Sequence, residues 1–369
     1  MSLTTTDRPF EVEAPNASSP TPALDPIRAT MSCSRGFVDW LVRHRVGMVA
    51  STYQAGQLVF IGARANGQVD VTSAGLSRAM GIAASPQRIY VGAAESIWRF
   101  ENMLAGSELV NERYDRLYLP RNAQMTGELD IHELAVEPSG RILFANTAYS
   151  CVATVDPVHA FKPLWKPAFI SKLAPEDRCH LNGLAMEEGR LRYVTACSTT
   201  DVVDGWRDHR RDGGVLIDVE PNAIVADGLS MPHSPRLRGN FIYLIESGRG
   251  ALIRIDRQSG QREDVAVLNS GFARGLAFSG DFAVVTISLP RPVNAGHALM
   301  LDERMREHKA VPWRGIQIVD LRSGDIVEWF RFDGAIRELF DVALIPGIRC
   351  PRGLGPEAPE LAEAVRWAL

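Results

Sequence analysis

Three of the eight histidines in the 369-residue chain stand at the entrance to short apolar runs. These are His132 in HELAVE, His180 in HLNGLAME and His233 in HSPRLRG. Imidazole is the commonest side-chain ligand of divalent transition metals, and three imidazoles with an open fourth position make a catalytic site. The pattern therefore predicts a divalent metal site, zinc in the simplest case, with iron, copper and calcium as alternatives. A polar pocket without a metal, or channel histidines bonded to backbone carbonyls and water, are the other interpretations.

Arginines fall at equivalent points of neighbouring units, and their fork geometry suits carboxylate or phosphate recognition. We expect Arg274 and Arg78 to hold a substrate carboxylate, and Tyr53 or Glu246 to move a proton. The remaining candidates for substrate contact are Asn146, Asn182, Arg236 and Arg337. Ion pairs with Glu133, Glu338 or Asp341 are the alternative role for the arginines, and packing at a strand end is the alternative for Tyr53.

Several familiar catalytic motifs are missing from the sequence. It contains no GxSxG elbow, no P-loop, no GxGxxG and no HExxH. Cys179 precedes His180, but neighbouring side chains of a strand point in opposite directions, which disfavours a Cys–His nucleophilic pair.

The elements that position these residues are short strands. From Gly47 onward, β-branched runs of four to seven residues alternate with Gly, Pro, Asn and Ser-Gly turns. A small or polar residue followed by an apolar run recurs at Ile82, Leu134, Leu184, Arg236, Leu276 and Asp341, with spacings of 52, 50, 52, 40 and 65 residues. A period of about 40–50 residues with four strands per unit is typical of a β-propeller.

The repeat predicts an all-β chain folded as a single six-bladed β-propeller over residues 31–355. Blades one to five are expected at 79–119, 130–166, 181–227, 233–267 and 273–331. Blade six combines 337–346 with 47–73, so that the N- and C-terminal strands close one blade and leave no open sheet edge there.

The two ends and two long loops lie outside this repeat. Residues 1–30 have the composition of a disordered leader, Ser34–Arg45 reads as a short helix with Ser34 as its N-cap, and 356–369 reads as a C-terminal helix. The loops 201–214 and 290–314 should border the functional opening and offer a surface for a peptide or protein partner.

Composition excludes several classes of protein. The net charge of −4, from 40 basic and 44 acidic residues, argues against a nucleic-acid partner. No run of 18 apolar residues predicts a membrane span, and the N-terminus lacks a secretory signal, so we expect a cytoplasmic protein. Five cysteines without a CxxC argue against a disulfide framework and a thiolate zinc site.

Six strings together resemble a family of bacterial conserved hypothetical proteins, a domain of unknown function: STYQAG, LDIHELAV, PEDRCHLNGLAM, DGWRDHRRDGG, LSMPHSPR and GFARGLAF. The resemblance covers roughly residues 31–355. It implies a bacterial protein with a propeller-like fold and brings no established activity.

More loosely, the expected ring is similar to six-bladed propeller lyases and lactonases. The peptidyl-hydroxyglycine lyase type uses a three-histidine zinc site with a tyrosine and an arginine, which His132, His180, His233, Tyr53 and Arg274 match by residue type. Its ligands lie on alternate blades, whereas the three histidines here lie on consecutive ones. The lactonase type uses a Glu/Asn/Asp calcium site and would require Glu246, Asn146 and Asn182 to converge.

Two hypotheses follow. The first is a metal-dependent lyase or hydrolase that acts on a small polar or peptidyl substrate in the central channel. The second is a non-catalytic propeller that serves as a binding module or scaffold for a peptide or protein partner.

Overall fold

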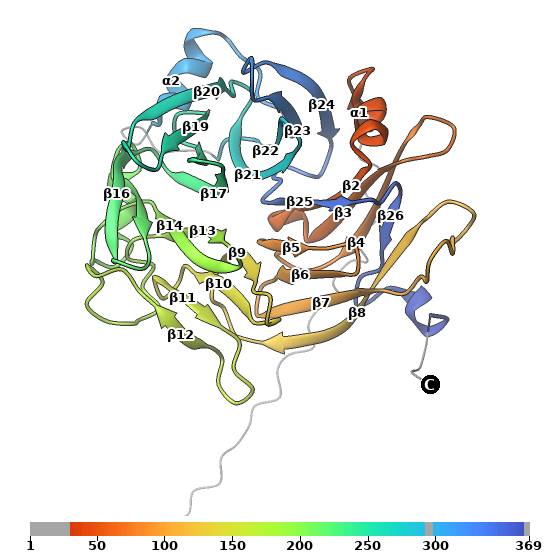
Figure 1. Cartoon of the computed structure of the whole chain (residues 1–369), viewed down its shortest axis with the longest axis horizontal. Coiled ribbons are helices and arrows are strands. Elements are labelled where there is room, and N and C mark those ends of the chain that lie inside the picture. The colour runs from red at the N-terminus through yellow and green to blue at the C-terminus, as the bar shows by residue number, and fades with distance from the viewer. Residues whose placement is uncertain (1–29, 292–297, 365–369) are drawn as a thin grey trace, which may run out of the picture.

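The strands of the chain form six sheets arranged as blades around a central channel (Figure 1). The computed structural model describes residues 30–291 and 298–364. Each blade is built from four antiparallel strands, which follow chain order in blades one to five, and the first strand of the blade is nearest the channel. The predicted all-β, six-bladed β-propeller is confirmed.

The blade boundaries lie within six residues of those expected from the repeat. Blade one holds β5 (Ile82–Ala84), β6 (Arg88–Gly92), β7 (Ser96–Asn102) and β8 (Arg116–Met125). Blade two holds β9 (Ile131–Val136), β10 (Ile142–Asn146), β11 (Cys151–Thr154) and β12 (Lys162–Trp165). Blade three holds β13 (Leu181–Glu187), β14 (Arg190–Ala196), β15 (Gly214–Asp218) and β16 (Ala223–Leu229). Blade four holds β17 (Pro232–Arg238), β18 (Phe241–Glu246), β19 (Ala251–Asp256) and β20 (Arg262–Val267). Blade five holds β21 (Phe272–Ser279), β22 (Phe282–Ser288), β23 (Arg314–Asp320) and β24 (Ile326–Asp333).

Blade six joins the two ends of the chain, as the sequence predicts. Its inner strand β25 (Val342–Pro346) pairs with β2 (Val46–Ser51), which is followed by β3 (Gln57–Ala63) and β4 (Val69–Gly75). Two further short strands flank this closure. β1 (Thr30–Cys33) pairs with β24 at the outer edge of blade five, and β26 (Pro351–Gly353) pairs in parallel with β8 at the outer edge of blade one.

The helices are short and lie between or beside the strands of the blades. α1 (Phe37–His44) buries Phe37, Trp40 and Leu41. Gly36, rather than Ser34, precedes its first residue, because the Ser34 hydroxyl donates to the Glu328 carboxylate instead. α2 (Met300–Glu307) belongs to the insertion of blade five, and the 3₁₀ helices are η1 (Tyr53–Ala55), η2 (Gly205–His209) and η3 (Pro359–Ala362).

The predicted terminal segments lie largely beyond the described residues. The leader expected over 1–30 is outside them except for Thr30, which belongs to β1. Of the helix expected over 356–369, the described part contains η3, and 365–369 lie outside. Within residues 30–291 and 298–364, no helix is long and apolar enough to cross a membrane.

Small hydroxyl side chains join successive blades at the end of the channel where the inner strands begin. Each ends the second strand of its blade, or directly follows it, and donates to a main-chain carbonyl at the inner strand of the next blade. The four pairs are Ser51 to Met80 at 2.5 Å, Thr147 to Leu181 at 2.6 Å, Ser247 to Ala273 at 2.5 Å and Ser288 to Leu339 at 3.0 Å. This repeated bond fixes the spacing of the blades around the site described below.

Glycine is required where blade one meets blade two. A Cβ at Gly81 would lie 2.7 Å from the Cα of Glu133 and 2.8 Å from the carbonyl oxygen of His132, both of them backbone atoms. Gly81→Ala is therefore expected to lower the free energy of unfolding by about 1–3 kcal/mol through overpacking. Urea denaturation measures the loss. Gly75→Ala is the control, because a Cβ there meets open space, and equal effects of the two changes would contradict the prediction.

Candidate functional site

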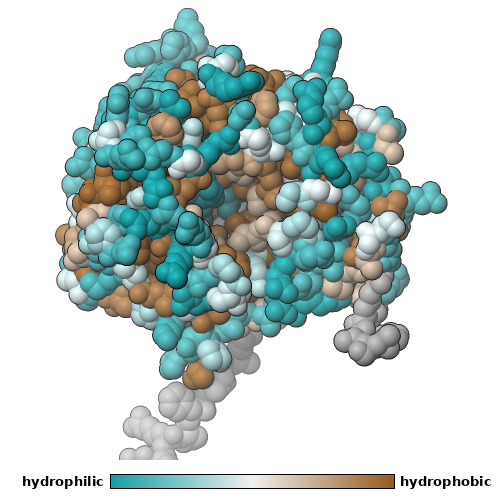
Figure 2. Space-filling model, in the orientation of Figure 1, coloured by the Kyte–Doolittle hydropathy of each residue, from teal (hydrophilic) through white to brown (hydrophobic). Residues whose placement is uncertain are grey.

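A cavity of about 390 Å³ opens at the end of the channel where the inner strands begin. In the space-filling view, the face of the ring has a depression near its middle, bordered by hydrophilic and hydrophobic residues (Figure 2). Ionisable and aromatic groups share the lining. They include Tyr53, Asp130, His132, Asp177, His180, Trp206, Phe272, Arg274, Glu338 and Phe340.

The two long loops border this cavity, as expected for the loops 201–214 and 290–314. Trp206, Arg207 and Arg210 line it from the first loop, and Arg291 and Asp302 from the second. Arg211 joins the loops, since its Nη1 and Nη2 donate to the two carboxylate oxygens of Glu303 at 2.8 and 3.2 Å.

The backbone adopts an unusual conformation where three inner strands begin. Asp130, His180 and Met231 directly precede β9, β13 and β17, and their φ angles are 53°, 53° and 48°. Left-handed backbone at residues other than glycine costs about 1–2 kcal/mol each and concentrates at functional sites. Tyr53 and Asp177, with φ of 46° and 41°, add to this set in the lining.

This turn shows that the three histidines do not share one position in the repeat. His132 and His233 are the second residues of β9 and β17, whereas His180 occupies the left-handed position before β13. The equivalent of His132 in blade three is Asn182. The imidazole of His180 therefore extends from the turn before its inner strand, whereas the other two imidazoles extend from the strands themselves.

Hydrogen bonds fix the tautomer of His132 and His233. The Thr147 hydroxyl donates to the Leu181 carbonyl, so Thr147 Oγ1 can only accept from His132 Nδ1, 2.8 Å away. That Nδ1 also lies 2.9 Å from the carbonyl oxygen of Asp130. The proton is consequently on Nδ1 of His132, and the lone pair is on Nε2.

His233 repeats this arrangement two blades further on, in blade four. Ser247 Oγ donates to the Ala273 carbonyl and accepts from His233 Nδ1 at 2.9 Å, and the Met231 carbonyl lies 2.9 Å from the same nitrogen. Burial, followed by the charge of Arg274, holds the pKa of His233 well below its ordinary value. A neutral imidazole thus presents Nε2 as an acceptor.

His180 forms a dyad with a carboxylate. Its Nδ1 lies 2.9 Å from Asp177 Oδ2, and the indole Nε1 of Trp206 donates to the same oxygen at 2.8 Å. The Trp206 ring stacks on the imidazole with 4.0 Å between ring centroids. This arrangement orients the ring and leaves Nε2 of His180 available, which is the geometry of a general base.

Arg274 is a buried cation between two aromatic rings. Its guanidinium carbon lies 5.2 Å from the Phe272 ring centroid and 4.6 Å from that of Phe340. Glu338 Oε1 lies 3.3 Å from Nη1, close enough for an ion pair. Among the described residues, however, neither Nε nor Nη1 of Arg274 has a hydrogen-bond partner. Buried donors of this kind need an acceptor, which a bound anion would supply.

A second ionic cluster lies deeper in the channel. Arg236 pairs with Glu133 across the ring, and Asp341 lies close enough to interact with both. Burial raises the pKa of Glu133 to about 7, although Arg236 opposes it. Glu133 and Asp341 also accept from the backbone N–H groups of Leu184 and Ile82 in the next blades. Arg236, predicted to contact substrate, thus forms part of this inner cluster and is absent from the cavity lining.

The structure places the other predicted site residues as follows. Tyr53 lines the cavity and stacks on Phe340 at 5.6 Å, and Arg78 pairs with Glu128 at 3.1 Å beside the rim. The rest are not brought to the lining. Glu246 is buried against Arg249 and the backbone N–H of Ser230, Asn146 accepts from the N–H of Tyr149, Asn182 accepts from Thr195, and Arg337 is exposed. The Glu246, Asn146 and Asn182 set required by the lactonase comparison therefore has its contacts elsewhere.

No shared metal site is evident in residues 30–291 and 298–364. No group of three or more His, Cys, Asp or Glu side chains there is placed to hold a metal ion. His132 and His180 are in ring contact, with centroids 4.7 Å apart at 82°, and His233 contacts Phe272 at 6.1 Å.

Asp177, Phe272 and Phe340 are lining residues that the sequence reasoning missed. Asp177 lies in the irregular loop before β13, and Phe340 lies in the loop before β25. Neither position follows the strand period. The only feature of the sequence that could have indicated them is that Asp177 is close to His180, and Phe340 close to Glu338, along the chain.

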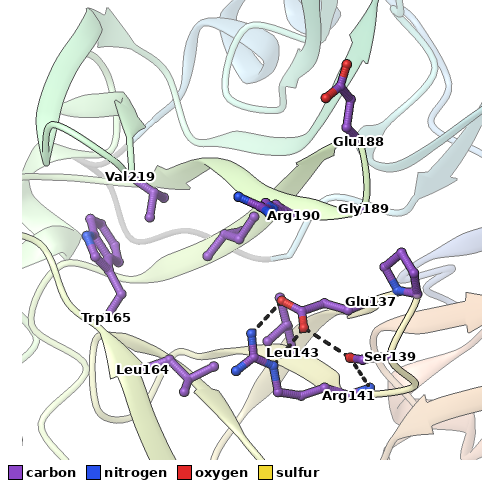
Figure 3. A pocket seen from close by; sticks show the side chains of 12 residues that line it. Glu137, Ser139, Arg141, Leu143, Leu164, Trp165, Glu188, Gly189, Arg190 and Val219 are labelled. Carbon is purple, nitrogen blue, oxygen red and sulfur yellow. Dashed lines mark hydrogen bonds and ion pairs between the residues drawn. The ribbon is translucent and has the colours of Figure 1, made fainter.

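A second, larger cavity of about 710 Å³ lies between blades two and three, at the far ends of the same inner strands (Figure 3). Its wall includes Leu164, Trp165, Leu191 and Val219. Its principal ion pair is internal, because both oxygens of Glu137 accept from the guanidinium of Arg141 at 2.7–2.8 Å. We therefore place the candidate site at the channel mouth, where charged donors lack partners.

The buried state of His132 predicts a dependence of stability on pH. Burial lowers its pKa to about 4, with Asp130 opposing this shift and the neighbouring His180 and Arg274 adding to it. The folded chain therefore binds fewer protons than the unfolded chain between about pH 6.5 and pH 4, and stability falls as the pH drops through this window. Relative to His132→Phe, the wild type should lose up to about 3 kcal/mol between pH 7.5 and pH 4. Urea denaturation at both pH values measures the difference. A constant difference would contradict the prediction.

Comparison with known proteins identifies a family and a fold. A family model described as a domain of unknown function (DUF4915) matches residues 35–354. No curated protein shows significant sequence similarity to the chain. Among solved structures, the chain is similar to one in a nidogen/laminin complex, with 12% identity, coverage of 83% of this chain and 99% of that chain, and a TM-score of 0.51.

Two enzyme structures show weaker similarity. One is a catalytically inactive virginiamycin B lyase from Staphylococcus aureus with quinupristin, with 11% identity, coverage of 65% and 73%, and a TM-score of 0.37. The other is a putative 6-phosphogluconolactonase from Bacteroides uniformis, with 15% identity, coverage of 78% and 83%, and a TM-score of 0.42. At such identities, structural similarity bears on fold alone.

Proposed function

The chain belongs to the DUF4915 family, a domain of unknown function, and from that premise we propose that the channel mouth is the active site of a lyase or hydrolase for small carboxylates. The observation that carries the proposal is the presence, in one cavity, of a carboxylate–imidazole dyad and of a buried guanidinium with two nitrogen donors that make no hydrogen bond. These are Arg274 and the pair Asp177–His180. The two units supply anion binding and proton transfer, which together suffice for acid–base chemistry beside a carboxylate.

In the proposed mechanism, Arg274 donates to the substrate carboxylate and holds it between Phe272 and Phe340. In a lyase, His180 Nε2 removes the proton from the carbon beside the carboxylate, the C–H electron pair forms a C=C bond, and the group on the next carbon leaves with its bonding pair and takes a proton from the imidazolium. In a hydrolase, His180 Nε2 removes a proton from water, the water oxygen attacks the ester carbonyl, and the alcohol leaves as the C–O bond breaks and takes the proton from the imidazolium. Asp177 accepts from Nδ1 and stabilises the imidazolium that forms. The Trp206 ring covers one face of the imidazole and limits its contact with water.

The experiment is a turnover screen followed by ¹H NMR. Purified protein is incubated with a mixture of small carboxylic acids and their esters, and the loss of each is recorded over time. We expect the wild type to convert at least one of them, and His180→Gln to slow that conversion by about 10²-fold or more. His209→Gln is the control, because its side chain is exposed on the same loop. Conversion that His180→Gln leaves unchanged, or an absence of any conversion, would overturn the proposal.

Metal binding by the three histidines is a separate proposal. The Nδ1 atoms of His132, His180 and His233 are each held by an acceptor, which leaves Nε2 as the atom a zinc ion would need. The mechanism above takes no step through a metal, since no three such ligands converge in the described residues. Elemental analysis of the purified wild type and of His180→Ala tests this proposal, and equal metal content in the two would contradict it.

A partner-binding module is the second candidate function. The observation in its favour is that Val202 and Val203, in the loop 201–214 beside the cavity, are 65% and 57% exposed. If the loop binds a peptide or protein, Val202→Ser with Val203→Ser should abolish that binding and leave carboxylate turnover unchanged.

A cytoplasmic location is also part of the proposal, because all five cysteines are free, as expected in a reducing compartment.

A further inference from the structure

The groups around Arg274 describe the ligand in more detail than a carboxylate alone. Two of its donors, Nε and Nη1, have no hydrogen-bond partner among the described residues. The same is true of Nε2 of His233, which is an acceptor. Arg274 is 6% exposed and His233 is 4% exposed. Unsatisfied buried donors and acceptors are rare in native proteins, and each costs about 1–3 kcal/mol until a partner arrives.

The unpartnered donors and acceptors are neighbours. The rings of Phe272 and Phe340 hold the guanidinium of Arg274, at 5.2 and 4.6 Å. His233 contacts the Phe272 ring at 6.1 Å, and His132 contacts the Phe340 ring at 5.1 Å. Each of the two imidazoles with a lone pair on Nε2 is thus packed against a ring that also packs against the guanidinium.

We infer that the ligand of this site is a hydroxycarboxylate, whose carboxylate accepts from Arg274 and whose hydroxyl donates to Nε2 of His233 or His132. This inference rests on the proposed function and narrows its substrate class. The tautomers fixed by Thr147 and Ser247 make Nε2 of both imidazoles an acceptor. His132 lines the cavity itself, whereas His233 lies behind Phe272, which lines it, so a ligand beside Arg274 must bring a donor toward these two rings.

The donor is a hydroxyl rather than an ammonium group. The charge of Arg274 acts on both imidazoles, and contributes to the low pKa of His132 and of His233. The same charge would repel an ammonium group placed between them.

The test is isothermal titration of the wild-type protein with matched acids at pH 7.5. The hydroxy acids are both enantiomers of lactate, glycerate and malate. The comparison acids are propionate and succinate, which lack the hydroxyl, and alanine and aspartate, which carry an ammonium group instead. We expect at least one hydroxy acid to bind about tenfold or more tightly than its deoxy and amino counterparts.

Variants separate recognition of the hydroxyl from general damage to the site. His233→Phe and His132→Phe keep a ring and remove the acceptor. At least one of them should reduce the ratio of hydroxy-acid to deoxy-acid affinity to about one, while deoxy-acid affinity stays within about twofold of the wild type. A purely structural role would weaken both classes of acid alike. Ser51→Ala is the control, because Ser51 makes the same bond between blades without a neighbouring imidazole.

The outcomes distinguish this inference from the proposed function. Equal binding of hydroxy and deoxy acids, or tighter binding of the amino acids, overturns the hydroxycarboxylate inference and leaves carboxylate binding standing. An absence of binding by every acid overturns both.

Discussion

Arg236→Met is expected to lower the free energy of unfolding by about 3–5 kcal/mol at pH 8. Arg236 is the cation of the inner channel cluster, and its removal leaves Glu133 and Asp341, each 3% exposed, without a positive partner. Both carboxyl groups are also bonded to the backbone of a neighbouring blade, so they cannot turn toward solvent without breaking the ring contacts. Urea denaturation monitored by tryptophan fluorescence measures the loss.

The loss in Arg236→Met should shrink when the pH is lowered to 5. Glu133, whose pKa burial already raises to about 7, then binds a proton and no longer carries an uncompensated charge. Arg238→Met is the matched control two residues further along β17. It breaks a surface pair with Asp281, which is worth at most about 1 kcal/mol. Losses of similar size in the two variants would show that the inner cluster is not a buried charge network.

Asp177→Asn is expected to reduce kcat by about 10²- to 10⁴-fold for the carboxylate that the wild type converts. The asparagine oxygen, in the place of Oδ2, would still accept from Trp206 Nε1. Its NH₂ group would take the place of Oδ1, 3.1 Å from His180 Nδ1, and the negative charge that stabilises the imidazolium would be lost. A donor at that point favours the tautomer with the proton on Nε2, which removes the lone pair that acts as the base. The cost falls on proton transfer, so KM should change little.

The control for Asp177→Asn is Asp208→Asn, which alters an exposed carboxylate in the adjoining loop. It should retain wild-type kcat. If Asp177→Asn also retains kcat, or if it raises KM and leaves kcat unchanged, then the dyad positions substrate and does not transfer the proton.

The fold could be predicted from the sequence because every blade repeats a local pattern. Turn residues and apolar runs recur at a constant period, and the unmatched segments at the two ends complete one blade. The strands β1 and β26 were not predicted. They are four and three residues long, and their pairing with β24 and β8 depends on where the ring brings the chain ends.

The site was predictable in part. The register places Tyr53, His132, His180 and Arg274 near one channel mouth, and the structure brings these four into one lining. The position of His180 in the turn before β13 was not predictable. The left-handed residue before the inner strand is a histidine at β13, an aspartate at β9 and a methionine at β17. Because these three residues differ in chemistry, their shared backbone conformation cannot be recognised from the sequence.

The predicted substrate contacts of Glu246, Asn146 and Arg236 were not found for a different reason. A polar residue at the end of a buried strand needs a partner, and the sequence does not say whether this partner is a ligand or the protein itself. In the structure, Arg249, the backbone of Tyr149 and Glu133 fill that role. Arg274 differs from them because its Nε and Nη1 have no hydrogen-bond partner within the described part of the chain, although Glu338 lies 3.3 Å from Nη1.

The central claim, that Arg274 binds the carboxylate of the ligand, is tested most directly by calorimetric titration of the wild type and Arg274→Met with the same small carboxylic acids. We predict measurable binding to the wild type and an affinity about 10- to 100-fold lower in Arg274→Met, since hydrogen bonds to a charged group are lost. Equal affinity of the two proteins for every acid that binds would contradict the claim and move the ligand away from the channel mouth.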